Sequence, residues 1–340
     1  MKRYGIAVLY RALALAVSLP LLAAGEKQEI VPVVNTGYLP ALLGLIDRAQ
    51  KGIDFIQLEW QYRPDVKKVQ DHLRGAMKRG VRVRGLLENK IRFNATSAEF
   101  LTKYGVQTKL DTTKKMTHNK LFVADGREVL LGSTNLTQNS MERNNETNVL
   151  IRDEAIGRFF EGYFEKLWED SEKEPALKPF TSGAVTAFTN RAYLKEILPL
   201  LLGAKSSIRV LMYGVNCSPD DPESAATRLV DALAAAAARG VKVQVLLDKS
   251  DYNDGINEVN KRAKAYLESK GVAVRYDDEE VTSHAKLICV DDAAVVGSYN
   301  WGYDALERRN ECAVIIRDKA TSEFFRKYFD ILWEGKRWVS

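Results

Sequence analysis

The sequence HNKLFVAD occupies residues 118–125 and is followed by GSTN at 132–135 and by Glu146. A second copy reads HAKLICVD at 284–291, GSYN at 297–300 and Glu311. The interval from Asn to Glu is 11 positions in both copies, and the second copy is one residue shorter between Asp and Gly, which predicts a tighter turn after Asp291. Two copies in the same order predict an internal duplication.

The repeat extends well beyond these motifs. GVRVRGLLE at 80–88 corresponds to GVKVQVLLD at 240–248, and KYGVQTK at 103–109 corresponds to SKGVAVR at 269–275. Each half ends in the same pattern of Phe, Leu and Trp, at 159–168 and at 324–333. The chain of 340 residues is long enough for two units of ordinary size, so the repeat predicts two homologous lobes.

Strand-like and helix-like periodicities alternate within each lobe. In the first lobe they predict strands at 29–34, 53–59, 81–87, near 106, 118–124, 128–132 and 146–151, and helices at 39–50, 66–78, 97–103 and 154–168. The second lobe repeats the series from Val185 to Trp333. Strands that alternate with crossover helices indicate the α/β class, with a mixed sheet flanked by helices in each lobe.

The first 25 residues differ from the rest of the chain. Three basic residues precede the apolar run 12–24, and small residues follow, which is the order of an export signal. A retained N-terminal anchor is the alternative, although 13 residues are short for a membrane span of roughly 20. We therefore expect an exported protein with a signal peptide at 1–25, lobe one at 26–168, a charged, Pro-containing linker at 169–183 and lobe two at 184–340.

Overall charge gives little support for a polyanionic partner. The formal net charge is +5, but the signal contributes three bases and no acids, so the remaining chain is close to neutral. A hydrophobic fraction of 46% and a charged fraction of 28% are those of a globular protein. Three cysteines, Cys217, Cys289 and Cys312, are too few for a disulfide framework and are expected to be buried thiols.

The motif residues suit the binding of a phosphate. In an extended strand residues i and i+2 share a face, so His118 and Lys120 point to one side, as do His284 and Lys286. A single histidine is commonly structural, and His72, on the polar side of a helix, fits that interpretation. Two of the three histidines occupy matched motif positions, however, where ammonium and amide donors can surround phosphate oxygens while imidazole faces phosphorus.

These motifs resemble the signature of the phospholipase D superfamily, H-x-K-x4-D-x6-G-S-x-N. The first copy matches every position, and the second has five residues instead of six before its glycine. The resemblance implies two phospholipase D-type lobes with one active site at their pseudo-two-fold interface. It also implies that one histidine attacks phosphorus to form a phosphohistidine, while the other protonates the leaving alcohol and then activates water or an acceptor alcohol.

The same resemblance implies a role for each motif residue. The first histidine is expected to be the nucleophile, as in relatives with two motifs. The glutamates would orient the histidines, and the Asp and Gly residues would be structural. Phosphate oxygens would be bound by the lysines and asparagines, assisted by the serines. The catalytic set is His118, His284, Lys120, Lys286, Asn135, Asn300, Glu146 and Glu311, with Ser133 and Ser298 as further phosphate ligands and Asp125, Asp291, Gly132 and Gly297 as the structural positions.

No metal or other cofactor is expected, because the lysines supply the positive charge and no further His or Cys cluster is present. The motif specifies a reaction but not a substrate. An exported phospholipase D that hydrolyses or transfers phospholipid head groups is the favoured interpretation. The alternatives are a non-specific endonuclease acting on DNA or RNA and a non-catalytic binding module. Because both motifs lie in one chain, we expect a monomer.

Two regions beside the motifs are candidates for substrate contact. Five aromatic residues near the motif ends could contact lipid, stack on bases or pack in the core. The loop at 214–223 is polar and acidic and is expected over the mouth of the cleft, where it would repel a nucleic-acid backbone. The aromatic residues are Trp60, Tyr62, Tyr213, Trp301 and Tyr303.

A shared site predicts that neither lobe works alone. Replacing His118 or His284 by Ala should each abolish phosphodiesterase activity, because attack and leaving-group protonation need both imidazoles. Steady-state assays of the two variants against wild type provide the measurement. Substantial activity in either variant would contradict a single site built from both motifs.

Overall fold

The computed structural model describes residues 28–249 and 253–339. The predicted signal peptide at 1–25 lies outside these residues, so the signal and the export that it implies stay predictions. No helix within the described residues is both long and apolar enough to cross a membrane.

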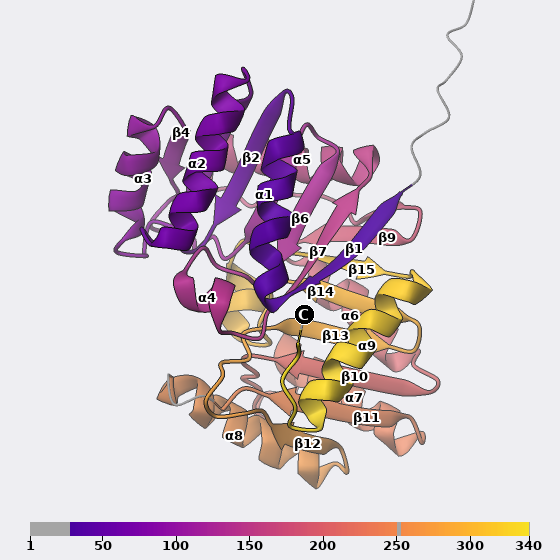
Figure 1. Cartoon of the computed structure of the whole chain (residues 1–340). Coiled ribbons are helices and arrows are strands. Elements are labelled where there is room, and N and C mark those ends of the chain that lie inside the picture. Colours follow the sequence, from indigo (N-terminus) through magenta and orange to yellow (C-terminus); the bar gives the residue numbers. More distant parts are fainter. Residues whose placement is uncertain (1–27, 250–252, 340) are drawn as a thin grey trace, which may run out of the picture.

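Lobe one contains a seven-stranded mixed sheet in the order β1-β7-β6-β5-β2-β3-β4. Its parallel pairs are β2 with β3 and β3 with β4, and the other neighbours are antiparallel. Figure 1 shows α1 and α2 on one face of this sheet and α5 on the other. The elements are β1 (Glu29–Val34), α1 (Tyr38–Arg48), β2 (Gly52–Gln57), α2 (Pro64–Lys78), β3 (Arg82–Leu87), α3 (Asn94–Lys103), β4 (Gln107–Leu110), β5 (Lys120–Ala124), β6 (Glu128–Gly132), α4 (Gln138–Glu142), β7 (Thr147–Arg152) and α5 (Glu154–Glu169).

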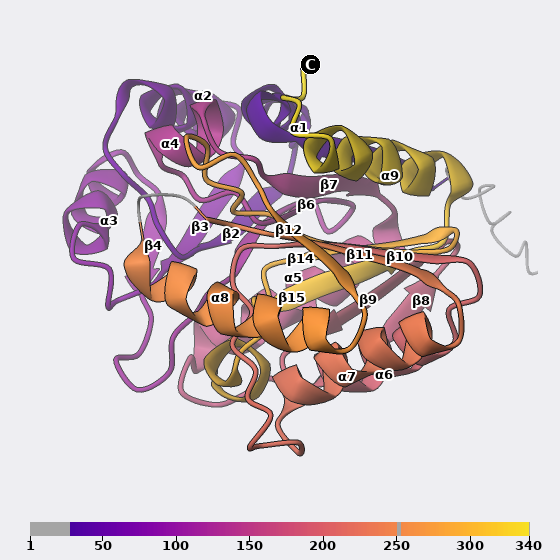
Figure 2. The ribbon, with the colours of Figure 1, turned by 90° about the horizontal axis from the view of Figure 1, so that it is seen from below.

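Lobe two repeats this arrangement with one additional edge strand, in the order β12-β11-β10-β13-β14-β15-β9-β8. Figure 2 shows α9 on one face of its sheet and α6, α7 and α8 on the other. The elements are β8 (Phe180–Ser182), β9 (Val185–Thr189), α6 (Ala192–Leu202), β10 (Ser207–Met212), α7 (Ala225–Ala238), β11 (Lys242–Leu247), α8 (Asp254–Ser269), β12 (Ala273–Tyr276), β13 (Lys286–Val290), β14 (Ala293–Gly297), β15 (Cys312–Ile316) and α9 (Lys319–Trp333).

The predicted α/β class and the two homologous lobes are confirmed, and the predicted elements of lobe one reappear within a few residues. Two details differ. The predicted linker contains β8, which pairs with β9. Strands β5 and β13 begin at Lys120 and Lys286, so both motif histidines precede their strands. The domain limits at 168 and 184 stay predictions.

The two lobes share a hydrophobic core. The apolar faces of β5 and β13, including Leu121, Val123, Leu287 and Cys289, pack in one cluster with buried residues of α5 and α9. The closing helices also reach across the interface, because α9 packs on β1 of lobe one and α5 packs on β8 and β9 of lobe two. All three cysteines are free and buried. The relative position of the lobes is therefore determined by a continuous apolar interface.

The motif glycines are needed for close packing between strands. A Cβ atom at Gly132 would lie 2.3 Å from the backbone oxygen of Thr147 on the neighbouring strand, and one at Gly297 would lie 2.5 Å from that of Cys312. Contacts this short are forbidden, so any larger residue would push the Gly-Ser-x-Asn segment away from the following strand. This accounts for the structural role expected at both positions.

Asp125 and Asp291 hold the turns after the motif strands. Both adopt left-handed backbone angles, with φ of 56° and 47°, which Asp tolerates better than most residues. The turn that begins at Asp291, between β13 and β14, has two residues, whereas the turn that begins at Asp125, between β5 and β6, has three. The predicted tighter turn in lobe two is therefore confirmed. The carboxylate of Asp125 accepts the backbone N–H groups of residues 50–52, where the chain enters the neighbouring strand β2. The carboxylate of Asp291 accepts those of residues 205–207, where the chain enters β10.

This turn predicts a pH-dependent contribution to stability. Burial alone would raise the pKa of Asp291, but hydrogen bonds from Ser206 and from three backbone N–H groups outweigh it and lower the pKa from 3.8 to about 2. Because the pKa is lower in the folded state, the carboxylate stabilises the fold above about pH 4, and this contribution is lost as the pH falls towards 2. Asp291→Asn should therefore reduce the free energy of unfolding by about 1–2 kcal/mol at pH 7.

Urea unfolding of the variant and wild type between pH 7 and pH 2 provides the measurement. The matched control is Asp292→Asn, because the neighbouring Asp292 side chain is 77% exposed and pairs with Arg326. An exposed ion pair contributes little, so the control should stay close to wild type. A deficit in Asp291→Asn that persists unchanged at the lowest pH would contradict the assignment.

Candidate active site

The motif histidines lie where each lobe pairs with the other. The residues just before β5 leave their own sheet: the N–H group of His118 donates to the carbonyl of Asn310 at 2.9 Å, and that of Asn310 donates to the carbonyl of Met116 at 2.9 Å. In the opposite direction, the N–H group of Asn145 donates to the carbonyl of Thr282 at 2.9 Å. Pairing with the opposite lobe explains why the strands begin later than predicted.

The two histidine–glutamate pairs are exchanged between the lobes. His118 Nδ1 lies 2.9 and 3.0 Å from the carboxylate oxygens of Glu311, and His284 Nδ1 lies 3.1 Å from both oxygens of Glu146. Each carboxylate therefore orients the imidazole of the other lobe and leaves Nε2 as the nitrogen available to a substrate. The sequence places one glutamate in each lobe but does not reveal this exchange.

The motif serines support the glutamates. The Ser133 hydroxyl donates to Glu146 Oε2 at 2.5 Å and accepts the N–H group of Thr147 at 2.9 Å. Ser298 donates to Glu311 and accepts the N–H group of Cys312 in the same way. Both hydroxyl protons thus point to the carboxylates, so the structure gives the serines a role in holding the glutamates. Their predicted role in binding phosphate stays a prediction.

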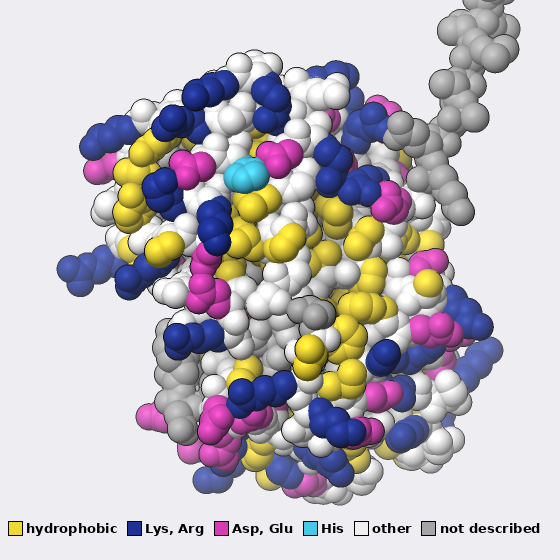
Figure 3. Space-filling model, in the orientation of Figure 1, with side chains coloured by type: hydrophobic (Ala, Val, Ile, Leu, Met, Phe, Trp, Pro, Cys, Tyr) yellow, Lys and Arg dark blue, Asp and Glu magenta, His cyan; other side chains and the backbone are white. Residues whose placement is uncertain are grey.

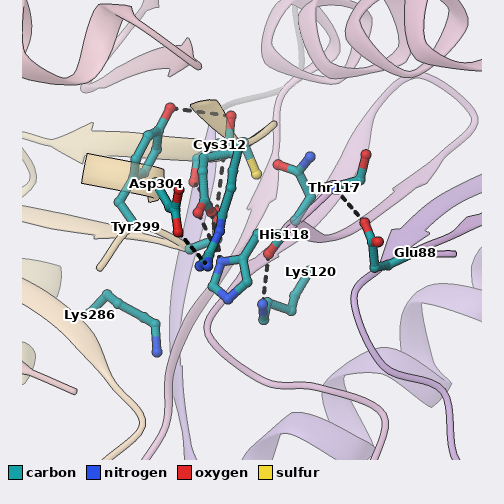
Figure 4. A network of polar contacts seen from close by, with 12 residues as sticks. Glu88, Thr117, His118, Lys120, Lys286, Tyr299, Asp304 and Cys312 are labelled. Atoms are coloured by element: carbon teal, nitrogen blue, oxygen red, sulfur yellow. Dashed lines mark hydrogen bonds and ion pairs between the residues drawn. The ribbon is translucent and has the colours of Figure 1, made fainter. Parts of the chain in front are cut away.

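The motif lysines are buried cations at the centre of the site. Figure 4 shows His118 between Lys120 and Lys286. Each Nζ donates to the carbonyl oxygen of the histidine two positions before it, at 2.7 Å in lobe one and 2.5 Å in lobe two. Burial destabilises the charged ammonium groups and lowers the pKa of Lys120 to about 8 and that of Lys286 to about 7. An anion bound between the lysines would restore their charge.

The motif asparagines have unused hydrogen-bonding capacity. The side-chain oxygens of Asn135 and Asn300 are buried without a hydrogen-bond partner. Buried polar atoms in proteins nearly always have partners, so a matched pair of unsatisfied amides indicates groups suited to a ligand. The oxygen and nitrogen of an amide can be exchanged by a flip, and after the flip each unpartnered position would hold the NH2 group, which can donate to a phosphate oxygen.

The two histidines differ in their electrostatic surroundings. Burial, the charges of Lys120 and Arg309 and further nearby cations lower the pKa of His118 well below its usual value. Burial also lowers the pKa of His284, but the carboxylate of Glu146 opposes this shift. In turn, His284 outweighs burial and lowers the pKa of Glu146, whereas burial raises the pKa of Glu311 to about 7. Of the two imidazoles, the one of His118 is therefore held more firmly in its neutral form.

A cavity of about 830 Å³ gives access to one side of the site. Its wall includes His284, Tyr213 and Asn135, whereas His118 does not line it and is only 5% exposed. The His284 ring packs against Tyr213, with ring centroids 4.8 Å apart. The two motif copies are thus similar in sequence but differ in access to solvent.

Most other sequence candidates lie outside this cavity. Trp60 and Trp301 are buried in the cores, and Tyr62 and Tyr303 are exposed without lining the cavity. Tyr213 alone among the five aromatic residues lines it. His72 lies beside Asp47 on the surface, as expected for a structural histidine. The loop at 214–223 was expected over the cleft mouth, but it contributes no residue to the cavity wall.

Sequence reasoning missed two charged residues near the site. Glu59 lines the cavity, and burial raises its pKa although Lys120 opposes the shift. Arg309 lies close enough to lower the pKa of His118 and pairs with Asp304, whose carboxylate is 3.5 Å away. Neither residue is repeated at the equivalent position of the other lobe, so comparing the two halves gave no signal for them.

Comparison with protein families accounts for both lobes. The family described as "Cardiolipin synthase, PLD-like domain" matches the chain twice, at residues 42–168 and 197–333. The chain belongs to the phospholipase D superfamily. Both matches contain one complete motif copy, so the family resemblance inferred from the motifs is confirmed.

Curated relatives of this phospholipase D-like chain include enzymes that cleave phosphodiesters. A mitochondrial cardiolipin hydrolase of Xenopus laevis is 33% identical over 162 residues, 47% of this chain and 70% of that protein. The corresponding protein of Xenopus tropicalis is 26% identical over the same shares. A phospholipase D of Rickettsia prowazekii is 31% identical over 147 residues, 42% of this chain and 64% of that protein. These matches have the length of about one lobe.

A solved structure confirms the two-lobed fold over nearly the whole chain. Phosphatidylserine synthase of Haemophilus influenzae superposes with a TM-score of 0.68, covering 90% of this chain and 86% of that protein at 14% identity. Polyphosphate kinase of Porphyromonas gingivalis gives 0.66 over 91% of this chain and 47% of that protein at 16% identity. At these identities the likeness concerns the fold.

The exchanged pairs predict that each glutamate affects the histidine of the other lobe. Glu146→Gln removes the charge that raises the pKa of His284, so that pKa should fall while the titration of His118 changes little. Loss of an orienting carboxylate should also lower kcat by about a hundredfold or more. Histidine-selective NMR titration and steady-state kinetics provide the measurements.

The control variant is Glu142→Gln, which removes an exposed carboxylate from the cavity rim. It should leave the titrations of His118 and His284 unchanged, and His72, on the surface outside the site, serves as an internal reference in every sample. A shift at His118 without one at His284 in Glu146→Gln would contradict the exchanged pairing.

Proposed function

We propose that this protein is a phospholipase D-type phosphodiesterase that releases or transfers a phospholipid head group through a phosphohistidine intermediate. The observation that carries the proposal is the convergence of two sets of His and Lys at one interface, each histidine oriented by a glutamate of the opposite lobe. Because a single chain supplies both sets, the proposal requires no second copy of the protein.

Access and electrostatics support different roles for the two histidines. In an in-line displacement the nucleophile and the leaving group lie on opposite sides of phosphorus. The leaving alcohol needs space, and the cavity reaches His284 and not His118. The strongly lowered pKa of His118 keeps its Nε2 unprotonated, as a nucleophile requires, while ionised Glu146 favours a proton on His284. His118 is thus the proposed nucleophile and His284 the proposed general acid.

The proposed reaction has two steps that balance without a metal ion. The lone pair of His118 Nε2 forms a bond to phosphorus, the bond from phosphorus to the head-group oxygen breaks, and His284 gives its proton to that oxygen. His284 then takes a proton from water or an acceptor alcohol, whose oxygen attacks phosphorus and releases His118. Both steps use the same in-line geometry in opposite directions.

The buried cations suit the charge that develops on phosphate. Lys120 and Lys286 would donate to the non-bridging oxygens together with the NH2 groups of Asn135 and Asn300, whose amides have an unpartnered end that a flip would turn into a donor. In a site shielded from water these interactions are stronger than they are in bulk solvent. The anion would also raise the pKa of both lysines, so binding and cation formation reinforce each other.

The wall of the cavity supports a polar leaving group. It is formed largely by amide, hydroxyl and charged side chains from both lobes, with few apolar ones, and suits a head group better than acyl chains. Figure 3 shows basic and acidic side chains interspersed over the viewed face, without the continuous basic surface typical of nucleic-acid binding. The names of the curated relatives also favour a phospholipid substrate.

A parallel assay tests the substrate class. Purified protein without added divalent metal should release head-group alcohol from vesicles containing phosphatidylcholine and cardiolipin, and it should not nick plasmid DNA. His118→Ala and His284→Ala proteins serve as controls for contaminating activities. Nicking without head-group release would establish the endonuclease alternative, and no cleavage of either substrate would contradict the proposed function.

A further inference from the structure

Two asparagines at matched positions form hydrogen bonds with the backbone of the two site glutamates. Asn35 follows β1, and its N–H group donates to the carbonyl of Glu146 at 3.2 Å, while its side-chain oxygen accepts the N–H group of Glu146 at 2.9 Å. Asn190 follows β9 and makes the same two bonds with Glu311, at 3.0 and 3.1 Å. Each asparagine thus closes a ring of hydrogen bonds around one glutamate.

The backbone conformation favours asparagine at these places. Asn35 and Asn190 have φ of 50° and 52°, in the left-handed region that Asn adopts more readily than other residues with a Cβ atom. This conformation turns the backbone N–H group and the side-chain amide towards the same neighbouring strand. The pattern is present in both lobes, which argues that it meets a requirement common to both glutamates.

A tyrosine from the opposite lobe completes each ring. The hydroxyl of Tyr328 on α9 donates to the side-chain oxygen of Asn35 at 2.7 Å, and that of Tyr163 on α5 lies 3.0 Å from the side-chain oxygen of Asn190. Both tyrosines are fully buried. They occupy the same position in the repeated closing helices, within EGYFEKLW and RKYFDILW, so comparing the two halves could have revealed them.

We infer that Asn35 with Tyr328, and Asn190 with Tyr163, are positioning residues that hold Glu146 and Glu311 against the histidines of the opposite lobe. The inference rests on the proposed function and adds a role for four residues outside the motifs. Each glutamate contacts the histidine of the opposite lobe. The asparagine that holds this glutamate is hydrogen-bonded to a tyrosine, which also belongs to the opposite lobe. Orientation of the imidazoles is thereby tied to the docking of α5 and α9.

The open side of the site depends on this support more than the closed side. On the Glu311 side, the hydroxyl of Tyr299 lies 3.0 and 3.2 Å from the carbonyl oxygens of Asn190 and Glu311 and can share its proton between them. Asn119 also donates to Tyr163 at 3.2 Å. The positions equivalent to Tyr299 and Asn119 are Thr134 and Ala285, which cannot repeat these bonds. Tyr328 is therefore expected to matter more than Tyr163.

Asn35 also contacts the chain just before His284. Its side-chain nitrogen lies 3.3 Å from the side-chain oxygen of Asn145, and Asn145 donates to the hydroxyl of Ser283 at 3.0 Å. A substitution at Asn35 can therefore affect His284 by two routes, through Glu146 and through Ser283, the residue before His284. Lys286, Lys120, His118 and the Tyr213 ring also face His284, and the Tyr328 hydroxyl is hydrogen-bonded to Asn35 and not to any of these four.

The decisive variant is Tyr328→Phe, which deletes one hydroxyl and keeps the packing of the ring. Loss of one hydrogen bond should loosen Glu146 and lower kcat by about five- to tenfold, with KM unchanged within about twofold. The pKa of His284, measured by histidine-selective NMR, should fall, but by less than in Glu146→Gln. Both effects should be weaker in Tyr163→Phe. There the change should appear at His118, whose neutral imidazole should carry its proton on Nε2 in a larger fraction of molecules.

The matched control is Tyr266→Phe. Tyr266 is half-buried on α8, and its hydroxyl donates to Asp231 Oδ1 on α7 at 2.7 Å, a hydrogen bond that forms no part of either ring around a glutamate. This control should lose one hydrogen bond but keep the kcat and the His284 titration of wild type. Asn35→Gly provides a second variant, because it deletes the side-chain amide while tolerating the left-handed backbone. It should change kcat and the His284 titration in the same direction as Tyr328→Phe and at least as much.

The two readouts separate failure of the inference from failure of the proposed function. If wild type cleaves no phosphodiester, the proposed function is wrong, but the NMR titration still reports whether Tyr328 positions the Glu146–His284 pair. An unchanged His284 titration in both Tyr328→Phe and Asn35→Gly would overturn the inference. Equal losses of kcat in Tyr328→Phe and Tyr266→Phe would overturn it as well, because they would show a general effect of stability.

Discussion

The exchange of histidine–glutamate pairs between the lobes is the constraint on which the site depends. Neither imidazole has its carboxylate partner within its own lobe, so the arrangement exists only when the two sheets dock in one relative position. That position is determined by the apolar cluster between the sheets and by α5 and α9, which each cross to the edge strands of the opposite lobe. The hydrophobic interface thus has a catalytic consequence, because a shift of an ångström would separate both pairs.

The exchange also concentrates buried charge in one place. Two lysines, two histidines and two glutamates lie at the interface, and burial disfavours the charged form of each. Serine hydroxyls and the opposite imidazoles contact the carboxylates, whereas each lysine Nζ donates to a carbonyl oxygen and Lys286 also lies over the Tyr213 ring. A bound phosphate diester would supply negative charge and further acceptors for the two ammonium groups. The site is therefore better suited to an anion than to any neutral ligand.

Duplication did not make the two halves equivalent. The cavity reaches His284 alone, Tyr213 packs on that imidazole, and Arg309 lies near the other. The proposed division of nucleophile and general acid between the two histidines depends on this asymmetry. Differences in residues outside the motifs break the symmetry, in access and in charge, while the motif residues themselves remain matched.

Much of this protein follows from its sequence. The duplication, the order of strands and helices, and the identity of the motif residues are visible there, because periodicity and repetition are local properties of a chain. Asp125 and Asp291 could be assigned a structural role for the same reason. Which glutamate meets which histidine, which histidine faces the cavity, and which tyrosine reaches which asparagine were decided only by the tertiary structure. The histidine–glutamate contacts and the contact of Tyr328 with Asn35 join residues more than a hundred positions apart. The geometry of all these contacts depends on how two apolar surfaces pack, which no local pattern encodes.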